Sequence, residues 1–527
     1  MVKGFVASVA GMAFAVLLLA ACGQAAKAAE AATAEQIDRI LLQLGDPDAQ
    51  VREKASVLLK NLPVAAYPDV ERVLEQHGDL DPETRARLTE VREDLRSLAA
   101  IARRVEELKK WNRENVLNDY EKFGSKNPAW NATAREALAR AVEATWPQQP
   151  LDAKGREAFE AALATKCDDA LFLYHYGLVG LRSGELDLHH GVLVLGRAAE
   201  AIAKSPYPAW RRCLVMGRYA SNVGKTPAGW PDIPLNDDRK YLGLAMREFE
   251  KLGPDRGVPP AMLYEIGSML VEAAHRERGG GMWTVQEVSK RMSKLAGGTA
   301  YALMFAARVE IDSTRYKYGV EGDATDEQRL AKAEELLERA YELDKSETRI
   351  STMMLDVTRR QGLDRQRMEN WFKRAMQANP DNLEACNKKI RYLLESEENG
   401  QQAAVAFARE LAAGQNWRGR LPFQLAEAHG LISTLQKSRL EYLARPDVWA
   451  DVKAVHDRYL TLYPDNLYVR CWYANLAAKM RRWDEAHRQF QIIGNEPDLR
   501  VFISMESYNY LRKKAERLGG QPVGKSQ

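Results

Sequence analysis

Cysteine is scarce in this chain, with five residues among 527, and no two of them form a C-x-x-C pair. Zinc knuckles and thioredoxin-like redox sites use such closely spaced pairs, so the sequence suggests neither. Four cysteines lie far apart within the body of the chain, and we expect each to be a singly buried thiol. An oxidising compartment would also permit disulfides, but the sequence does not give their pairing. The four are Cys167, Cys213, Cys386 and Cys471.

An excess of charge of one sign is also missing. The chain has 76 basic and 73 acidic residues, well mixed along its length, and a formal net charge of only +3. A domain that binds duplex nucleic acid usually has a concentrated basic face and a strongly basic isoelectric point. We therefore predict no nucleic-acid partner.

Known catalytic and cofactor signatures are absent as well, since the chain contains neither G-x-S-x-G nor H-E-x-x-H. The stretch RERGGGMW at 276–283 lacks the Gly-Lys-Ser/Thr of a phosphate loop, and we interpret it as a loop between helices. His189 and His190 lie near Asp187, with His175 as a third candidate ligand, but adjacent helical residues point about 100° apart. We predict no catalytic residue, no cofactor and no metal site.

One long apolar run is present, at the start of the chain. Residues 4–26 carry no charge between Lys3 and Lys27, and their apolar part approaches the about 20 residues that cross a bilayer. A short cationic start, an apolar centre and small residues at the end are typical of a secretory signal. No other apolar run in the sequence reaches spanning length.

Leu19-Ala20-Ala21-Cys22, followed by glycine, resembles the lipobox of bacterial lipoproteins. The resemblance implies that residues 1–21 are a signal peptide, that lipid is attached to Cys22, and that residues 22–33 form a flexible tether. It also implies export to the cell envelope and lipid anchoring to a membrane, which in a Gram-negative cell we expect to be the periplasmic face of the outer membrane. Two alternatives stay open: ordinary cleavage near Ala26-Lys27-Ala28, and an uncleaved signal anchor.

Helical periodicity dominates the rest of the chain and predicts an all-α protein. A hydrophobic content of 46% with eleven tryptophans is enough apolar material for ordered cores. Residues 34–95 begin with two amphipathic helices, and Asp46-Pro47 and Asp81-Pro82 are typical helix starts. The apolar stripe of the first two helices consists of Ile37, Ile40, Leu41, Leu44, Val51, Ala55, Leu58, Leu59 and Leu62.

The pattern from Asp48 through Arg52 to Leu58 resembles the second half of a HEAT repeat. A second copy has Arg85, preceded by Thr84 where the first has valine. The resemblance implies a ladder of aspartate and arginine along a solenoid. Two HEAT-like units over 34–95 are fewer than the three usually needed for a free-standing solenoid, so we expect them to pack on helices from the later part of the chain.

Residues 96–155 are predicted to be a helical connector, with one long polar helix over 96–122 and a short alanine-rich helix after a proline-rich break. Residues 156–320 contain helix pairs that end at prolines, as tetratricopeptide (TPR) units do, and we interpret them as divergent TPR-like helices. Capping-box patterns predict helix starts at Thr284, with Glu287, and at Thr325, with Gln328. The first of these helices should stop at Gly297-Gly298.

Residues 321–518 resemble TPR repeats most clearly, and residues 519–527 are predicted to be a disordered tail. In two stretches, 370–382 and 459–490, a bulky residue, a small residue and a proline that ends a helix stand where TPR repeats place them. The resemblance implies a superhelix with a long concave binding surface. The matching residues are Phe372, Ala375, Pro380, Pro464, Ala486 and Phe490.

Two sets of side chains are candidates for binding, each with a simpler alternative. Tryptophans near prolines could form a ligand-facing rim, but core wedges between helices explain them more simply: Trp130, Trp146, Trp210 and Trp230. Basic residues could line a partner-binding groove, but a solvated helix face is the simpler interpretation. Our partner-binding candidates are Arg470, Trp472, Arg481 and Arg482, and Arg211 with Arg212 could line a similar groove.

Together these features predict an α-solenoid, with a HEAT-like pair followed by a TPR-like array. The leading functional hypothesis is a lipid-anchored scaffold of the cell envelope that binds a protein or peptide on the concave surface. One alternative is an envelope enzyme, for example one acting on glycans, with an unrecognised site in residues 156–320. Another is a structural spacer.

Overall fold

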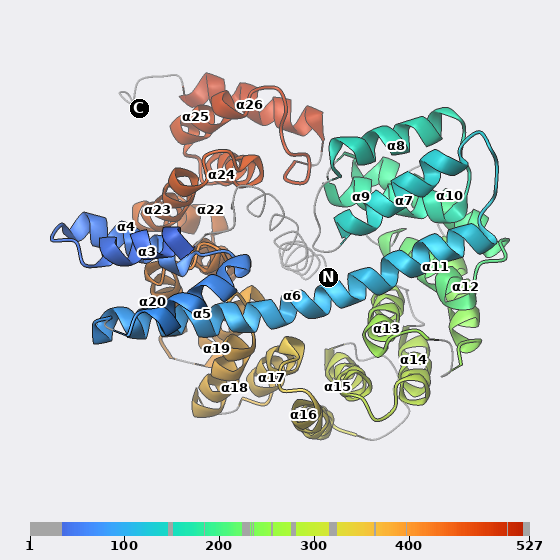
Figure 1. Ribbon diagram of the computed structural model, residues 1–527, viewed down its shortest axis with the longest axis horizontal. Helices are drawn as coiled ribbons and strands as arrows, with labels where there is room; N and C mark the ends of the chain where they lie inside the picture. Colours follow the sequence, from blue (N-terminus) through green and yellow to red (C-terminus); the bar gives the residue numbers. More distant parts are fainter. Residues whose placement is uncertain are drawn as a thin grey trace. The chain divides into compact units, whose positions relative to one another are not determined.

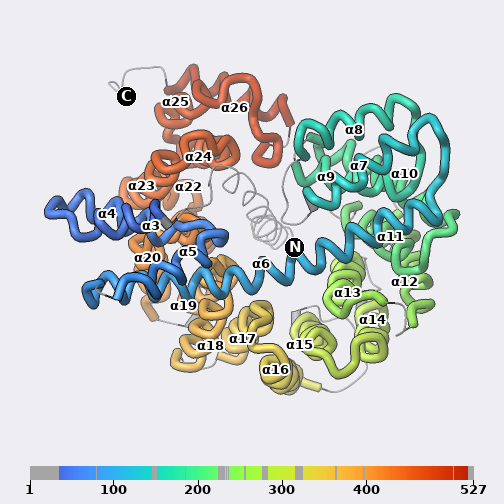
Figure 2. Tube along the Cα trace, in the orientation of Figure 1, coloured from blue at the N-terminus to red at the C-terminus, as the bar shows by residue number. Residues whose placement is uncertain are grey.

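The protein is described by a computed structural model, shown as a ribbon in Figure 1 and as a Cα tube in Figure 2. It contains 24 α-helices and no strand among the residues that it describes, so the prediction of an all-α protein is confirmed. The described residues are 34–78, 80–145, 151–183, 185–223, 232, 234, 237–253, 257–275, 281–315, 324–362, 365–396, 398–502 and 504–519.

The chain divides into two compact units. Residues 106–364 form one, which we call the central unit, and residues 1–105 with 365–527 form the other, which we call the terminal unit. One helix, α6 (Pro82–Phe123), contributes residues to both units.

The central unit is a succession of helices in chain order. After the C-terminal part of α6 come α7 (Asn131–Thr145), α8 (Ala153–Ala164), α9 (Ala170–Ser183), α10 (Leu188–Ala203), α11 (Ala209–Val223), α12 (Asp237–Glu250), α13 (Pro260–Ala274), α14 (Gly281–Leu295), α15 (Ala300–Arg315), α16 (Asp326–Leu343) and α17 (Thr348–Arg360).

Helix packing in the central unit is that of an α-solenoid. Each helix from α9 to α16 contacts its successor, and α11 also packs on α13, which packs on α15. The green and yellow helices of Figure 2 follow this succession. Because each element touches mainly its near neighbours along the chain, the apolar core is a seam that runs from pair to pair.

The terminal unit joins the two ends of the chain. It begins with α3 (Ala34–Leu44), α4 (Ala49–Lys60), α5 (Tyr67–Gln76) and the start of α6. It resumes with α18 (Arg365–Ala378), α19 (Leu383–Ser396), α20 (Gly400–Ala413), α21 (Gln424–Leu435), α22 (Arg439–Leu443), α23 (Pro446–Leu462), α24 (Leu467–Lys479), α25 (Trp483–Ile493) and α26 (Met505–Gly519). Two 3-10 turns, Val64–Ala66 and Leu421–Phe423, complete it.

Side-chain caps fix several helix starts in the way the sequence indicates. Asp48 accepts a hydrogen bond from the backbone N–H of Gln50 at the start of α4. Thr325 and Gln328 form the predicted capping box at the start of α16, which confirms that prediction. The capping box predicted at Thr284 is wrong, because α14 already begins at Gly281 and Thr284 lies inside it.

Helix α6 is longer than the sequence pattern predicts. The pattern indicates a HEAT-like helix before residue 96 and a separate polar helix over 96–122, whereas α6 runs without a break for 42 residues. No glycine or proline occurs between Glu83 and Phe123, so no residue interrupts the hydrogen-bond ladder. The helix ends where Gly124 follows.

Arg52 and Arg85, the arginines of the two predicted HEAT-like copies, have the same local role. Arg52 donates from Nη1 to the carbonyl oxygens of Asp46 and Pro47, at 2.7 and 2.8 Å. Arg85 donates to the carbonyl oxygen of His77 at 2.7 Å. Both side chains therefore stabilise the loop before their own helix through its backbone.

The loop 414–420, between α20 and α21, holds the end of α4 through hydrogen bonds. Arg418 Nη1 donates to the carbonyl oxygens of Lys60 and Leu62, at 3.1 and 3.2 Å. Its backbone N–H donates to Asn61 Oδ1 at 2.7 Å, and its Nε donates to Asp381 Oδ2 at 3.0 Å. A guanidinium thus satisfies carbonyls that a helix C-terminus leaves unpaired. We call loop 414–420 the clasp.

Candidate functional site

The predicted partner-binding residues lie on α24 and the turn after it, at opposite ends. Arg470, in the first turn, donates to Gln489 Oε1 at 2.9 Å and to the carbonyl oxygen of Pro464 at 2.6 Å. Arg482, beyond the last turn, donates to the carbonyl oxygen of Ala444 at 2.8 Å. Trp472 is half-buried and Arg481 is exposed. The structure therefore does not gather these four side chains at one point.

Arg211 is a correction to the predicted basic groove. Its side chain is 0% exposed, so it lies neither on a solvated helix face nor on a groove wall. Its guanidinium pairs with Asp119 at 3.0 Å and stacks on the Trp210 ring, 3.9 Å from the centroid. Arg212, its neighbour, pairs with Glu248 at 2.7 Å.

Trp210 is buried in the core, as the wedge interpretation expects. Its ring centroid lies 5.5 Å from that of Trp111. Trp130 is half-buried and donates from its indole N–H to the carbonyl oxygen of Ser125. Trp146, Trp230, residues 276–280 and Cys22 with the whole leader lie outside the described residues.

The histidines considered for a metal do not converge. Asp187 caps α10, accepting from the backbone N–H of His190 at 2.8 Å, and also contacts His190 Nδ1 at 2.9 Å. His175 is buried on α9. Within the described ranges no group of three or more His, Cys, Asp or Glu side chains could hold a metal ion.

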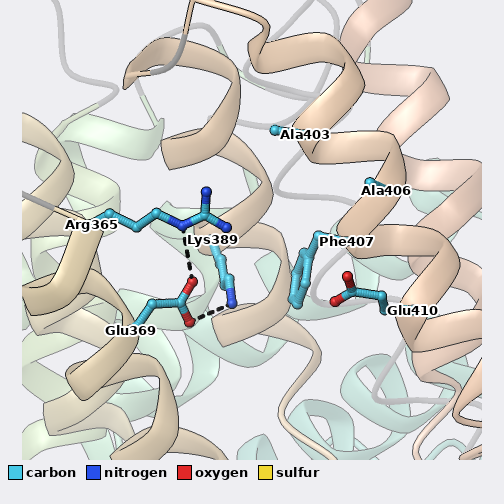
Figure 3. A pocket seen from close by; sticks show the side chains of 7 residues that line it. All are labelled: Arg365, Glu369, Lys389, Ala403, Ala406, Phe407 and Glu410. Carbon is cyan, nitrogen blue, oxygen red and sulfur yellow. Dashed lines mark hydrogen bonds and ion pairs between the residues drawn. The ribbon is translucent and has the colours of Figure 1, made fainter.

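A pocket of about 430 Å³ opens between α18, α19 and α20 in the terminal unit (Figure 3). The walls of the pocket come from three successive helices, so the packing of these helices forms the pocket. The lining residues are Arg365, Glu369, Lys389, Ala403, Ala406, Phe407 and Glu410.

Lys389 organises the inner end of this pocket. It is only 7% exposed, and its Nζ lies 2.6 Å from Glu369 Oε2. The same ammonium lies 4.3 Å from the ring centroids of both Phe372 and Phe407, whose rings meet edge to face at 5.5 Å. A charged hydrogen bond and two cation–π contacts compensate the burial of the ammonium.

The rim of the pocket carries charge of both signs. Arg365 has a side chain 61% exposed and lies 3.6 Å from Glu369 Oε1. Glu410, on α20 beyond Phe407, is also exposed and makes no ion pair with any residue that the structure describes (Figure 3). The pocket can therefore take a group whose cationic part meets Glu410 and whose anionic part meets Arg365.

A second polar cluster in the terminal unit centres on His429. Its Nδ1 lies 2.9 Å from the Tyr442 hydroxyl, and its Nε2 lies 3.0 Å from Asp451 Oδ2, which also accepts from Arg409. Burial lowers the pKa of His429, although the carboxylate of Asp451 opposes this shift. Because a carboxylate only accepts, Nε2 carries the proton and Nδ1 accepts from the tyrosine. Both ring nitrogens of His429 are therefore hydrogen-bonded within the cluster.

The pocket residues were not among the predicted binding residues. The spacing of Arg365 and Glu369, one helical turn apart, indicates an ion pair on α18. No local sequence pattern indicates that Lys389 lines a pocket, because its partners Glu369 and Phe407 lie 20 and 18 positions away on the neighbouring helices.

No helix in the described part of the chain is long and apolar enough to cross a membrane. A comparison of the chain with protein-family models finds no match, and a comparison with curated proteins finds none either.

Proposed function

We propose that this protein is a lipid-anchored component of the cell envelope that binds a segment of a partner protein or peptide. The pocket between α18, α19 and α20 is the binding site in this proposal, and it is the observation that carries it. The HEAT-like and TPR-like resemblances support a binding role, since such arrays commonly present an extended surface to other chains.

The chemistry of the pocket favours a peptide segment over a small apolar ligand. Its inner end is closed by the Lys389 ammonium and the Phe407 ring, and its rim offers the exposed side chains of Arg365 and Glu410. Arginine and aromatic side chains frequently anchor protein interfaces. A partner segment with a basic and an acidic side chain would pair with Glu410 and Arg365 while covering Phe407.

The test uses a photo-cross-linking amino acid in the full chain, in the cells that make it. Ala406 lines the pocket and is exposed, and Gln401 is exposed on the same helix but does not line the pocket. We expect a cross-linker at position 406 to yield one dominant protein adduct, and one at position 401 to yield none. Adding Glu410→Lys should abolish the adduct, because it reverses the charge that meets the partner's basic group.

Two outcomes would count against binding at this pocket. One is the same adduct pattern from positions 401 and 406. The other is an adduct that survives Glu410→Lys unchanged, since the rim charge would then have no part in recognition. If no adduct forms at either position, the structural-spacer alternative gains instead.

The anchor is tested separately through Cys22. We expect the wild-type chain to take up labelled fatty acid and to sediment with membranes, and Cys22→Ala to do neither. Several acyl chains hold a protein on a bilayer where one short chain would not. A Cys22→Ala chain that still sediments fully with membranes would contradict the lipoprotein proposal and favour an uncleaved signal anchor.

The alternative of an envelope enzyme with a site in residues 156–320 stays a prediction. It would require titratable groups that converge on a pocket there. A structural spacer would need neither that site nor a binding partner.

A further inference from the structure

Helices α12 and α14 of the central unit carry an excess of exposed positive charge. Helix α12 packs on α11 and α13, and α14 packs on α13 and α15. Arg291 on α14 joins the two helices, because its Nη2 donates to the carbonyl oxygens of Glu250 and Leu252 at the end of α12. The exposed basic residues of this pair, including the one directly after α12, form a surface that we call the basic face: Arg239, Lys240, Arg247, Lys251, Lys290 and Lys294.

Few carboxylates balance the charge of the basic face. Glu250 is the only exposed acidic residue among those described on α12 and α14. Two lysines of the face pair with half-buried carboxylates, at 4.0 and 2.7 Å, but Arg247, Lys290 and Lys294 make no ion pair with any residue that the structure describes. Helix α16 has the opposite balance, since it exposes five acidic residues and two basic ones. The positive charge is therefore local to α12 and α14, in a chain whose net charge is only +3.

An exposed tryptophan extends the basic face on α14. Trp283 is 64% exposed. Gln286, Lys290 and Lys294 follow it by 3, 7 and 11 positions, a spacing that keeps all four side chains on one side of the helix. Tryptophan joins an apolar ring to one polar N–H, and lysine carries its charge on a flexible apolar stem. Both side chains therefore suit the boundary between water and lipid.

A bilayer with anionic headgroups matches both the charge and the tryptophan of this surface. Anionic lipids attract clusters of lysine and arginine, and an interfacial tryptophan adds an apolar contact. The stripe on α14 is about 16 Å long at 1.5 Å per residue, so a plane can touch its four side chains together. An acidic protein would match the charge as well, but a chain tethered to a membrane meets lipid headgroups at a far higher local concentration.

We propose that the basic face and Trp283 dock on an anionic phospholipid surface. The basic side chains pair with lipid phosphates, and the indole ring enters the headgroup layer. This inference rests on the lipid anchoring of the proposed function, but not on the peptide pocket between α18, α19 and α20. Since acyl chains on Cys22 would already hold the chain on the bilayer, docking orients the central unit on the membrane rather than attaching it.

The test places a fluorophore on the α14 stripe of the full lipidated chain. Gln286→Cys gives an exposed attachment site between Trp283 and Lys290, and the four described native cysteines are buried. The labelled chain is incorporated into vesicles of phosphatidylcholine alone or of an equal mixture with phosphatidylglycerol, each containing a nitroxide-labelled lipid as quencher. We expect strong quenching in the mixed vesicles and little in phosphatidylcholine. A fluorophore attached through Ala331→Cys, exposed on α16, is the matched control and should be quenched in neither.

Charge reversal on the basic face should release the central unit from the bilayer. Lys290→Glu with Lys294→Glu should shift the docking equilibrium roughly thirtyfold or more toward the undocked state, because two lysines near an anionic surface contribute about that factor. Lys332→Glu with Arg339→Glu makes the same change of charge at exposed positions on α16 and should leave the quenching unchanged. Raising the ionic strength to about 1 M, where the Debye length is about 3 Å, should abolish the quenching.

The proposal is overturned if the fluorophore at position 286 is not quenched in the mixed vesicles, or if quenching is equal in both kinds of vesicle. It is also overturned if polyglutamate changes the emission while vesicles do not, because the occupant would then be an acidic protein. Flotation with phosphatidylcholine vesicles tests the anchor separately. A chain that does not float with them contradicts the lipoprotein proposal, whereas quenching in the mixed vesicles still decides whether the basic face docks.

Discussion

At the scale of single residues, Asp94 on α6 is a carboxyl group whose ionised form is disfavoured by its position in the fold. Burial raises its pKa from 3.8 to about 6, and the carboxylates of Glu90 and Asp381 act in the same direction. Arg418 and Lys60 oppose this shift but do not cancel it. The folded protein therefore binds the Asp94 proton more tightly than the unfolded chain does.

The sign of the resulting pH dependence is set by linkage. Stability contributed by Asp94 is fully present below the unfolded pKa near 4 and is lost as the pH rises through about 6. We expect Asp94→Asn to raise the free energy of unfolding at pH 7.5 by about 1 kcal/mol, a value reduced for solvent screening of a partly exposed group. Urea denaturation at pH 7.5 and pH 4 measures it, and the difference should vanish at pH 4.

Glu107→Gln is the control for this prediction, since Glu107 is exposed on the same helix. A gain of equal size from Glu107→Gln would point to general charge repulsion. A loss of stability on Asp94→Asn would mean that the attraction to Arg418 outweighs the burial of the carboxylate.

The four described cysteines confirm the expectation of single buried thiols, since each is free and buried. Burial raises the pKa of the Cys167, Cys386 and Cys471 thiols to about 12, and it also raises the pKa of Cys213. Since the thiolate is the reactive form, a Cys22→Ala chain should show no reaction with a thiol reagent at pH 8 until it is unfolded. Urea should then expose four thiols. Rapid labelling of the folded chain would disprove the burial.

At the scale of elements, the clasp depends on one arginine that reaches three segments. Arg418 and Asp381 have side chains only 12% and 18% exposed. Replacing Arg418 with glutamine leaves Asp381 without its cationic partner and the carbonyls at the end of α4 without their donor. Since breaking a buried pair costs about 3–5 kcal/mol, we expect a loss of about 3 kcal/mol in the free energy of unfolding of the terminal unit.

Arg445→Gln provides the comparison for Arg418→Gln. Arg445 pairs with Asp447, but both side chains are more than half exposed, at 54% and 53%, so this change should cost less than about 1 kcal/mol. Arg418→Lys should behave like Arg418→Gln, because an ammonium cannot reproduce the planar fork. Equal and small losses from all three variants would show that the clasp contributes little.

The clasp also explains local backbone features that look unfavourable in isolation. Gln415 and Arg420 have positive φ angles of 54° and 55°, a region that residues with side chains rarely adopt. Gly419 approaches Asp381 so closely that a Cβ there would lie 2.6 Å from Oδ1. The contacts of Arg418 and Asn416 with Asp381 hold the loop in this conformation.

At the scale of the whole molecule, the terminal unit forms from segments more than 350 positions apart in the chain, as the bond between Arg418 and Asn61 shows. Deleting residues 34–62 removes the partners of the clasp. We expect amide hydrogen exchange in 414–420 to accelerate roughly tenfold or more, because the Arg418 N–H loses its acceptor. Exchange in α9–α15 of the central unit should not change.

Hydrogen exchange followed by mass spectrometry resolves these segments. Loss of protection in both units after the deletion would contradict the independence of the central unit. Unchanged exchange in 414–420 would show that the clasp folds without α4.

Local patterns were sufficient for several features of the fold. The caps at Asp48 and Thr325 act between residues at most three positions apart, so their signals lie within the stretch that they shape. The bulky and small residues taken as packing positions, such as Ala375 and Phe490, are indeed buried. Apolar periodicity likewise indicated the all-α class, because the apolar positions on one face of a helix recur every three or four residues.

The candidate sites could not be predicted from the sequence, because they depend on contacts between residues far apart in the chain. Arg211 looked like a surface residue in the sequence, yet Asp119, 92 positions earlier, accepts its hydrogen bond and makes its burial tolerable. Burial by the elements packed around them is the main cause that raises the pKa values of the Glu427 and Asp94 carboxyls. The sequence alone does not show whether a charged side chain is buried or exposed in the fold.

The sequence by itself determined the helical class, the main helix starts and the burial of the isolated cysteines, because these depend on composition and on neighbours within a few turns. Only the tertiary structure decided which charges are buried together, where α18, α19 and α20 leave a pocket, and that the clasp holds α4. Those features arise where helices from distant parts of the chain pack, and a pairing of that kind is decided by the free energy of the whole fold.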